Sequence, residues 1–163
     1  MERIWSPWRS AYIESFKSAP EKTGCIFCEF PKLNKDEENL ILFRGKTCFV
    51  IMNLYPYNSG HLMVVPFLHT TELSNLDEES SAEIILLLAK CQKAIREELK
   101  AQGFNIGVNI GKVAGAGIEE HIHFHIVPRW NGDTNFMPVF ADIKVVPEEM
   151  KKSYSKLRPY FLV

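Results

Sequence analysis

The sequence predicts an α+β domain in which an antiparallel sheet is covered by one long helix. Two apolar stretches, 47–52 and 60–65, flank a segment rich in turn-forming residues and predict two strands joined by a loop. Two stretches that alternate with period two, 104–110 and 120–127, predict a second pair of strands. Between the pairs, residues 78–101 carry apolar side chains at helical spacing. This order of elements is typical of α+β proteins with an antiparallel sheet.

The composition is that of an ordinary globular domain. The 163 residues fit a single domain, and 46% hydrophobic with 24% charged residues permit a buried core. A net charge of −1 argues against a bulk positive field for nucleic acid or an anionic membrane. No apolar run approaches the roughly 20 residues of a membrane span, and the N-terminus lacks the apolar region of a secretory signal. We therefore expect a soluble, cytoplasmic protein with no nucleic-acid or membrane partner, whose four cysteines are thiols or metal ligands.

Three regions follow one another along the chain. Residues 1–23 form an aromatic, basic N-terminal arm, which either lines a substrate cleft or braces a dimer. Residues 24–130 form the main domain. Residues 131–163 form a C-terminal extension expected to pack on that domain, with a short helix at 147–157.

The long helix predicts a homodimer. It begins after Asp77, a favourable N-cap, and is closed by Gly103. Its segment 84–89 is apolar on every side, which packing against the chain's own core does not explain. A second copy that pairs through 78–101 and 104–110 would cover the remaining apolar surface.

Three histidines alternate with apolar residues near the end of the main domain. In a strand His121, His123 and His125 would share one face, with apolar residues on the other. A row of buried imidazoles needs partners for its ring nitrogens, so the row predicts anion binding, metal binding or nucleophilic attack. The preceding turn, 111–117, is rich in glycine and either exposes backbone N–H groups to phosphate or simply closes a hairpin. The two features together favour phosphate chemistry.

The motif His121-Ile-His-Phe-His-Ile-Val127 resembles the signature of the histidine triad (HIT) superfamily of nucleotide hydrolases and transferases. Asn53, the Gly-His pair at His61 and the Pro66-Phe-Leu-His69 step resemble the family's second motif. The flanks Trp5-Ser-Pro-Trp8-Arg9 and Pro128-Arg-Trp-Asn-Gly-Asp133, continuing into Asn135-Phe-Met137, are similar to the bacterial branch of diadenosine tetraphosphate phosphorylases (ATP adenylyltransferases). One departure is that Gly117-Ile118 stand where many members carry Gln, Ser or Thr, so substrate preference does not transfer directly.

The resemblance implies a HIT-like fold, a homodimer and a covalent mechanism. The middle triad residue, His123, would attack the α-phosphorus of an adenine nucleotide or dinucleoside polyphosphate, and a neutral imidazole is nucleophilic near pH 7. His125 would assist at the transferred phosphate, while His61 and His121 would support the triad. The resemblance implies that Asn53 hydrogen-bonds the ribose. It also implies an apolar base pocket, whose residues equally suit a plain core: Ile26, Phe27, Ile51 and Leu54. The implied phosphate contacts are Asn109 and backbone N–H groups near Gly115 and Gly117.

Cys25 and Cys28 form a C-x-x-C pair that alone could bind zinc, be redox-active or be incidental. The resemblance implies that the pair joins His69 and His121 in a closed, tetrahedral, structural zinc site that needs no organic cofactor. Cys48 and Cys91 lie in apolar patterns and are expected in the core.

Two other functions stay open from the residues. The first is a nucleotide-binding adaptor or sensor with little turnover. The second is metal-dependent hydrolysis on the histidine row.

Overall fold

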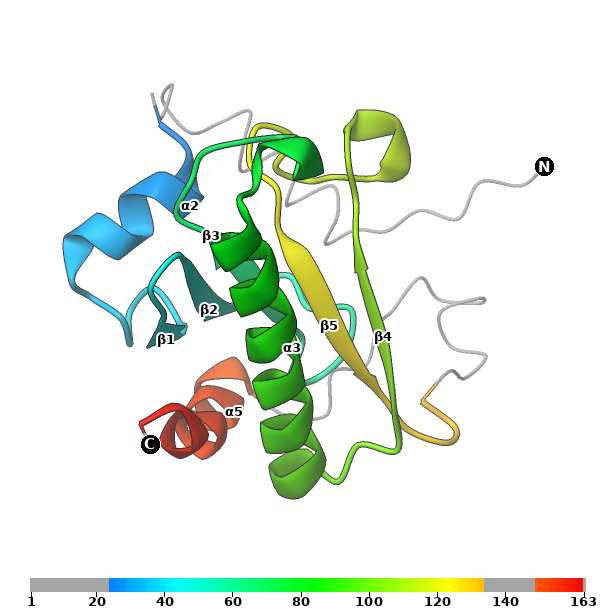
Figure 1. Cartoon of the computed structure of the whole chain (residues 1–163). Helices are drawn as coiled ribbons and strands as arrows, with labels where there is room; N and C mark the ends of the chain where they lie inside the picture. Colours follow the sequence, from blue (N-terminus) through cyan, green and yellow to red (C-terminus); the bar gives the residue numbers. More distant parts are fainter. Residues whose placement is uncertain (1–23, 134–148, 163) are drawn as a thin grey trace, which may run out of the picture.

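The computed structural model describes residues 24–133 and 149–162. It contains a five-stranded sheet in the order β1-β2-β3-β5-β4, in which every neighbouring pair is antiparallel. Figure 1 shows one long helix, α3, lying across this sheet. The predicted α+β class is therefore confirmed. The strands are β1 Ile41–Arg44, β2 Cys48–Met52, β3 Leu62–Pro66, β4 Gly103–Val108 and β5 Phe124–Arg129.

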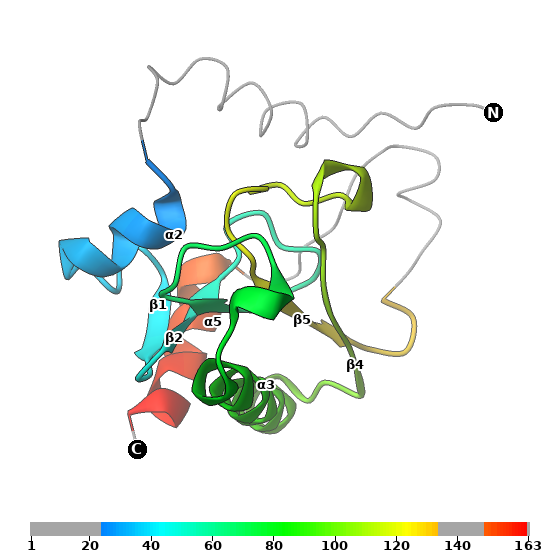
Figure 2. The same ribbon diagram turned by 45° about the horizontal axis from the view of Figure 1, so that its top comes forward.

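Helices cover both faces of the sheet. The long helix α3 (Glu78–Leu99) and the C-terminal helix α5 (Met150–Leu157) pack on one face, in a core with β2 and β3 residues such as Val50 and Val64. The short helix α2 (Ile26–Glu29) packs on the opposite face through Phe27. Figure 2 shows α2 and α3 on opposite sides of the sheet. Single turns of 3-10 helix complete the described chain: η1 Phe30–Leu33, η2 Leu73–Asn75, η3 Lys112–Ala114 and η4 Arg158–Phe161.

The helix α3 begins where the sequence predicts but ends earlier than predicted. The Asp77 carboxylate accepts a hydrogen bond from the Ser80 N–H at 2.7 Å, so the predicted N-cap is confirmed. The helix ends at Leu99, before the predicted limit, and Lys100 takes the left-handed conformation with φ 55°. Gly103 does not close the helix, because it already belongs to β4.

The structure corrects the expected strand 120–127. β5 begins only at Phe124 and continues through Pro128 to Arg129. The cause is Pro66 at the end of β3. The Phe67 N–H donates to the carbonyl of Thr47, the residue before β2, so the backbone of Pro66 faces β5, where it has no N–H to continue the ladder.

Two elements were not predicted, β1 and α2. Both are four residues long, too short for a reliable periodicity. Tyr154 in α5 donates its hydroxyl to the Ile41 carbonyl at 3.0 Å and so ties the C-terminal helix to β1. The predicted helix 147–157 appears as α5, while the N-terminal arm 1–23 and the segment 134–148 lie outside the described residues.

Within the described ranges, no helix combines the length and apolar character needed to cross a membrane. The two cysteines predicted in the core, Cys48 and Cys91, are fully buried there.

Candidate active site and metal centre

The three triad histidines gather on the face of the sheet covered by α2. His123 and His125 have ring centroids 4.9 Å apart, and the Phe27 ring lies 5.1 Å from His123 and 5.5 Å from His121. Only His125 stands within β5, whereas His121 and His123 lie in the extended segment before it. That segment is held by the Ile122 N–H, which donates to the Thr70 carbonyl at 2.7 Å. The predicted common face survives although the predicted strand does not.

One ring nitrogen of His123 is fixed by the backbone. Nδ1 lies 2.8 Å from the carbonyl oxygen of His121, which only accepts, so Nδ1 carries the proton. In the neutral ring this leaves Nε2 with a lone pair. The side chain is 4% exposed, and its orientation is further restricted by the Phe27 ring.

A hydrogen-bond relay fixes the tautomer of His125. The Tyr57 N–H donates to Nδ1 of His61 at 3.0 Å, so in neutral His61 the proton sits on Nε2. That Nε2 lies 2.9 Å from Nδ1 of His125 and donates to it. The remaining nitrogen of neutral His125, Nε2, is therefore protonated and acts as a hydrogen-bond donor.

Burial keeps these imidazoles neutral. Burial lowers the pKa of His123 below the ordinary value for histidine, because the charged form loses its hydration. Burial, with a smaller contribution from the charge of His123, lowers the pKa of His125 to about 4. At neutral pH both rings are thus uncharged, and neutral His123 has its lone pair on Nε2 whereas neutral His125 has its proton there.

Tyr57 is a contact that sequence reasoning missed. Its ring stacks on His61 with centroids 4.9 Å apart, and its backbone N–H sets the His61 tautomer. The loop between β2 and β3 was correctly predicted, but no periodicity reports which loop amide points at a histidine.

The residues expected at the base and ribose lie at two depths. Phe27 and Ile51 are buried in the core beneath α2, 1% and 3% exposed, whereas Ile26 is half-buried and Leu54 is exposed. Asn53 is half-buried and donates through Nδ2 to Nδ1 of His61 at 3.3 Å, while its Oδ1 accepts from Tyr55 N–H at 2.9 Å.

The glycine-rich turn is folded on itself. The Gly115 N–H donates to the Lys112 carbonyl at 2.9 Å, so this amide is not available to phosphate in this conformation. Asn109 is half-buried and directly follows β4. Gly117 lies at a cavity of about 490 Å³ that Glu72, Glu119 and Glu120 also line. Its acidic lining does not suit a polyphosphate. A smaller cavity of about 190 Å³ contains Asn53 and His61 in its wall, and neither cavity is lined by His123 or His125.

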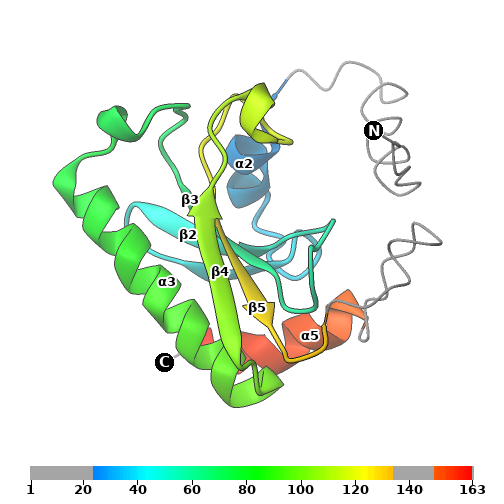
Figure 3. The same cartoon turned by 90° about the vertical axis from the view of Figure 1, so that its right-hand side faces the viewer.

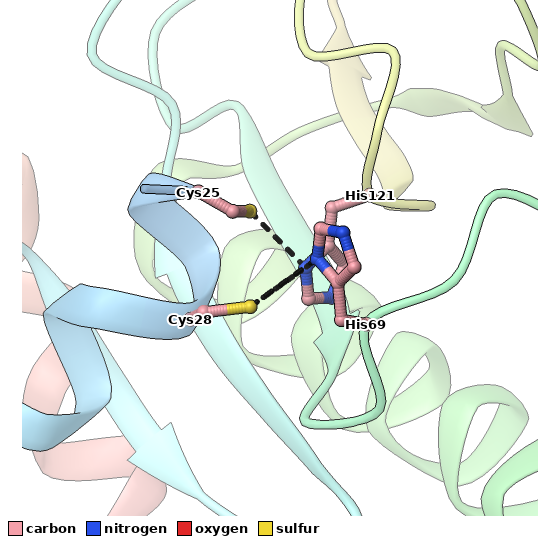
Figure 4. Close-up of side chains that lie close together, drawn as sticks. All are labelled: Cys25, Cys28, His69 and His121. Atoms are coloured by element: carbon pink, nitrogen blue, oxygen red, sulfur yellow. Dashed lines mark hydrogen bonds between the residues drawn. The ribbon is translucent and has the colours of Figure 1, made fainter. Parts of the chain in front are cut away.

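A second cluster lies at the other end of the row. The side chains of Cys25, Cys28, His69 and His121 converge so that one ligand atom of each lies within 4.8 Å of the others. Figure 4 shows the two cysteines reaching from α2 toward the two imidazoles, which come from the loops after β3 and before β5. All four residues predicted as metal ligands are therefore brought together.

Four of the six distances between ligand atoms in this cluster are close to those around a tetrahedral zinc ion. Zinc bonds of about 2.0–2.1 Å to nitrogen and 2.3 Å to sulfur place two nitrogens about 3.3 Å apart, and nitrogen about 3.6 Å from sulfur. The Nδ1 atoms of His69 and His121 are 3.3 Å apart, and Cys28 Sγ lies 3.3 Å and 3.6 Å from them. Cys25 Sγ lies 3.3 Å from His121 Nδ1.

The surroundings of the cluster also suit a cation. Nε2 of His121 donates to the Pro66 carbonyl at 2.8 Å, which leaves the lone pair of neutral His121 on Nδ1, facing the thiols. Burial raises the pKa of the Cys25 thiol to about 11, so without a cation this sulfur stays protonated. A bound divalent ion reverses that preference, because it stabilises the thiolate.

Comparisons with known proteins agree with this geometry. An AP-4-A phosphorylase from Mycobacterium tuberculosis is 40% identical over 156 residues, which cover 93% of this chain and 80% of that protein. An adenosine 5'-monophosphoramidase from Schizosaccharomyces pombe is 31% identical over 128 residues, covering 78% of this chain and 91% of its own.

A similar fold is found among solved structures. A zinc-bound histidine triad family protein from Mycobacterium smegmatis matches with a TM-score of 0.68 and 27% identity, covering 85% of this chain and 94% of that one. A sequence model of the HIT domain matches residues 34–132, more than half of the chain. With its triad, fold and relatives in agreement, this chain belongs to the HIT domain family.

Proposed function

We propose that this protein cleaves dinucleoside polyphosphates at the α-phosphate through a covalent nucleotidyl-histidine on His123. The specific reaction is phosphorolysis of diadenosine tetraphosphate to ATP and ADP. The observation that carries the proposal is the hydrogen bond from Nδ1 of His123 to the His121 carbonyl, because it leaves Nε2 as the nucleophilic atom. The 40% identity to an AP-4-A phosphorylase supports the choice of substrate.

In the first step Nε2 of His123 attacks the α-phosphorus, and the bond from phosphorus to the bridging oxygen breaks. ATP leaves with the electron pair of that bond. A polyphosphate leaving group carries this charge without full protonation, so a neutral His125 suffices as a hydrogen-bond donor through Nε2.

In the second step inorganic phosphate attacks the adenylyl-histidine. A phosphate oxygen bonds to the α-phosphorus while the bond to Nε2 of His123 breaks, which releases ADP and restores the lone pair. Phosphate arrives already ionised, so it needs no base to become a nucleophile. Each step is an easier displacement than a direct transfer between two polyanions.

The nucleoside is proposed to bind beside α2 and the loop before β3. The Asn53 amide has two donor hydrogens and two acceptor lone pairs, and its recorded bonds to His61 and Tyr55 use one of each. It retains the capacity to bond a ribose hydroxyl. We assign the base to the side of Ile26 and Leu54, above the buried Phe27 and Ile51. Asn109, directly after β4, is assigned to the phosphates. The Gly115 amide is used within its own turn, and Gly117 lies at the acidic cavity, so neither glycine is assigned to a phosphate.

We assign a structural zinc ion to Cys25, Cys28, His69 and His121. All four positions of the tetrahedron are filled by protein atoms, which leaves none for substrate. The ion would join α2 to the segment that carries the triad and fix the position of His121. The reacting histidines, His123 and His125, remain outside this group.

We also infer a homodimer that pairs through α3 and β4. Figure 3 shows β4 at the edge of the sheet, and two consecutive apolar residues of α3, Ile85 and Leu86, are 66% and 69% exposed. In β4, Ile106 is 49% exposed. An open edge beside apolar side chains is a surface that a second copy of the same chain covers by sheet extension.

The decisive experiment incubates the protein with diadenosine tetraphosphate, with and without inorganic phosphate, and identifies the products by mass spectrometry. We expect ATP and ADP only when phosphate is present, and an adenylyl adduct that maps to His123. His123→Ala should form neither adduct nor product. Full turnover by this variant contradicts the proposal, and AMP in place of ADP changes the acceptor from phosphate to water.

The same experiment distinguishes the proposed enzyme from a nucleotide-binding adaptor with little turnover. An adaptor binds AMP tightly, forms no adduct at His123 and releases no product. Addition of a metal chelator tests for metal-dependent hydrolysis, because such an activity would stop at once while the fold persists.

A further inference from the structure

The position of His61 is set by the turn that precedes it. Its backbone N–H donates to the Asn58 carbonyl at 3.1 Å, and its own carbonyl accepts from the Asn53 N–H at 3.0 Å. The ring is 1% exposed and bonds His125 at 2.9 Å. The direction in which His61 presents its Nε2–H to His125 therefore depends on where Asn58 holds the chain.

Asn58 is itself held by its side chain. Its Nδ2 group donates to the Pro128 carbonyl at 3.2 Å and to Oδ2 of Asp133 at 3.0 Å, using both amide hydrogens. Its Oδ1 accepts from the Ser59 N–H at 3.1 Å. The amide thus joins the turn before His61 to the far end of β5.

Asp133 anchors the other end of this connection. Its carboxylate accepts from Nε and Nη2 of Arg129 at 2.6 Å and 2.8 Å, and from the Trp130 N–H at 3.1 Å. Its side chain is 11% exposed. The tight turn that returns Asp133 to Arg129 has Gly132 at φ 77°, a conformation that glycine adopts without strain, and is closed by the Asp133 N–H bond to the Trp130 carbonyl at 3.1 Å.

We propose that Asn58 and Asp133 are positioning residues that act on His125 through His61. The inference rests on the proposed function for its kinetic consequence, but not for its structural one. The connection runs from the Arg129–Asp133 ion pair to the Asn58 amide, through the turn to His61, and from His61 to Nδ1 of His125. It gives a role to the turn Arg-Trp-Asn-Gly-Asp133, which begins at the last residue of β5.

The effect of the connection is on the donor and not on the nucleophile. If Asn58 is released, His61 loses the backbone position that aims its Nε2–H at His125, and Nδ1 of His125 loses its partner. His125 then exchanges between its two neutral tautomers and spends part of the time without a proton on Nε2. His123 keeps its own bond to the His121 carbonyl, so the nucleophile is unaffected.

The kinetic test compares Asn58→Ala with Gln102→Ala. Gln102 is the matched control, because its side chain accepts from the Asn131 N–H in the same turn at 2.6 Å, whereas both amide hydrogens of Asn58 go to Pro128 and Asp133. We expect Asn58→Ala to lower kcat for diadenosine tetraphosphate phosphorolysis about 10-fold or more with KM nearly unchanged, since misplacing one catalytic group by about 1 Å costs up to 100-fold. Gln102→Ala should keep kcat. Equal kcat in Asn58→Ala and the control overturns the proposal.

A second variant keeps the kinetic test decisive if Asn58→Ala fails to fold. Asp133→Asn keeps the shape but turns an amide donor toward the donors of Asn58 and Arg129. We expect the same split between kcat and KM from a smaller structural change. A rise in KM with unchanged kcat in this variant also overturns the proposal.

The structural test needs no activity. Nitrogen NMR of the imidazoles at neutral pH should show His125 in the Nε2–H form in the wild type, and averaged between tautomers in Asn58→Ala and Asp133→Asn. An unchanged His125 signature in both variants overturns the positioning role even if the protein is active. If the wild type shows no turnover, the proposed function fails while the tautomer measurement still decides this inference.

Discussion

At the scale of single residues, the proposed chemistry depends on which nitrogen of each histidine carries the proton. Backbone groups make that choice at three rings: the His121 carbonyl for His123, the Tyr57 N–H for His61 and the Pro66 carbonyl for His121. A peptide carbonyl only accepts and a peptide N–H only donates, so each bond admits a single neutral tautomer. Backbone geometry thereby determines which nitrogen of His123 would attack phosphorus in the proposed reaction.

The first prediction concerns stability against pH. Because His125 is neutral in the folded protein with a pKa of about 4, the unfolded chain binds a proton more readily at any pH between about 6.5 and 4. Unfolding is therefore favoured as pH falls through this window. We expect His125 to reduce the free energy of unfolding by about 2 kcal/mol between pH 7 and pH 5.

Urea denaturation of the wild type and of His125→Gln at both pH values measures this contribution. The variant lacks the titrating imidazole, so its free energy of unfolding should fall by about 2 kcal/mol less than that of the wild type between pH 7 and pH 5. The same pH dependence in both proteins would contradict the buried, neutral state of His125.

At the scale of elements, one carboxylate joins the long helix to the hairpin of β1 and β2. Glu83 in α3 accepts from three backbone N–H groups, those of Lys46, Thr47 and Cys48, at 2.8, 2.6 and 2.9 Å. The Thr47 hydroxyl donates to it as well, at 2.6 Å. Burial raises the pKa of Glu83, but these bonds outweigh burial and the pKa is lowered overall.

The second prediction is that Glu83→Gln destabilises the fold by about 2–3 kcal/mol. The glutamine keeps one acceptor oxygen but points an NH₂ group at backbone donors, which leaves partly buried N–H groups, those of Thr47 and Cys48, without their acceptor. Thermal or urea denaturation measures the change. Glu97→Gln, on the exposed face of the same helix, is the control and should stay within about 0.5 kcal/mol of the wild type. Equal stability of the two variants would refute the role assigned to Glu83.

At the scale of the whole molecule, two features decide how the parts hold together. The cluster of two cysteines and two histidines joins α2, the loop after β3 and the segment before β5. In the sheet of the described residues β4 is an edge strand, and with the exposed apolar residues of α3 it forms the surface through which we propose that two chains pair.

The third prediction is that the protein as purified carries one zinc ion per chain and that Cys28→Ser lowers this content. A serine hydroxyl replaces the thiolate ligand poorly, so the melting temperature should fall in step with the zinc content. Elemental analysis and thermal melting, each with and without chelator, measure the two quantities. The buried Cys91→Ala serves as the cysteine control and should retain zinc. Full zinc content in Cys28→Ser would exclude the assigned ligand set.

The fourth prediction is that Leu86→Glu converts the dimer into a monomer. A charge at the centre of an apolar interface loses its hydration without gaining a partner. Light scattering at micromolar concentration reports the mass. Leu33→Glu is the control, because Leu33 is equally apolar and 53% exposed but lies in η1, away from α3 and β4. If the wild-type protein has the mass of a monomer at this concentration, the proposed dimer is wrong.

Local patterns in the sequence determined much of the architecture. The helix was predictable because its apolar spacing runs over 22 residues with a capping aspartate, and four strands because their alternation or flanking turns are strong. The triad and all four candidate metal ligands could be named because the spacing of histidines and cysteines is itself the signal. β1 and α2 were missed because four residues hold too little periodic information.

What only the tertiary structure decided is how distant groups meet. The start of β5 depends on a proline in β3. The lone pair on Nε2 of His123 depends on a carbonyl two residues earlier, and the proton on Nε2 of His125 depends on the loop amide of Tyr57. The link from Asp133 to Asn58 crosses 75 residues of chain. Hydrogen bonds act over about 3 Å in space and leave no period along the sequence, so folding alone selects the partners.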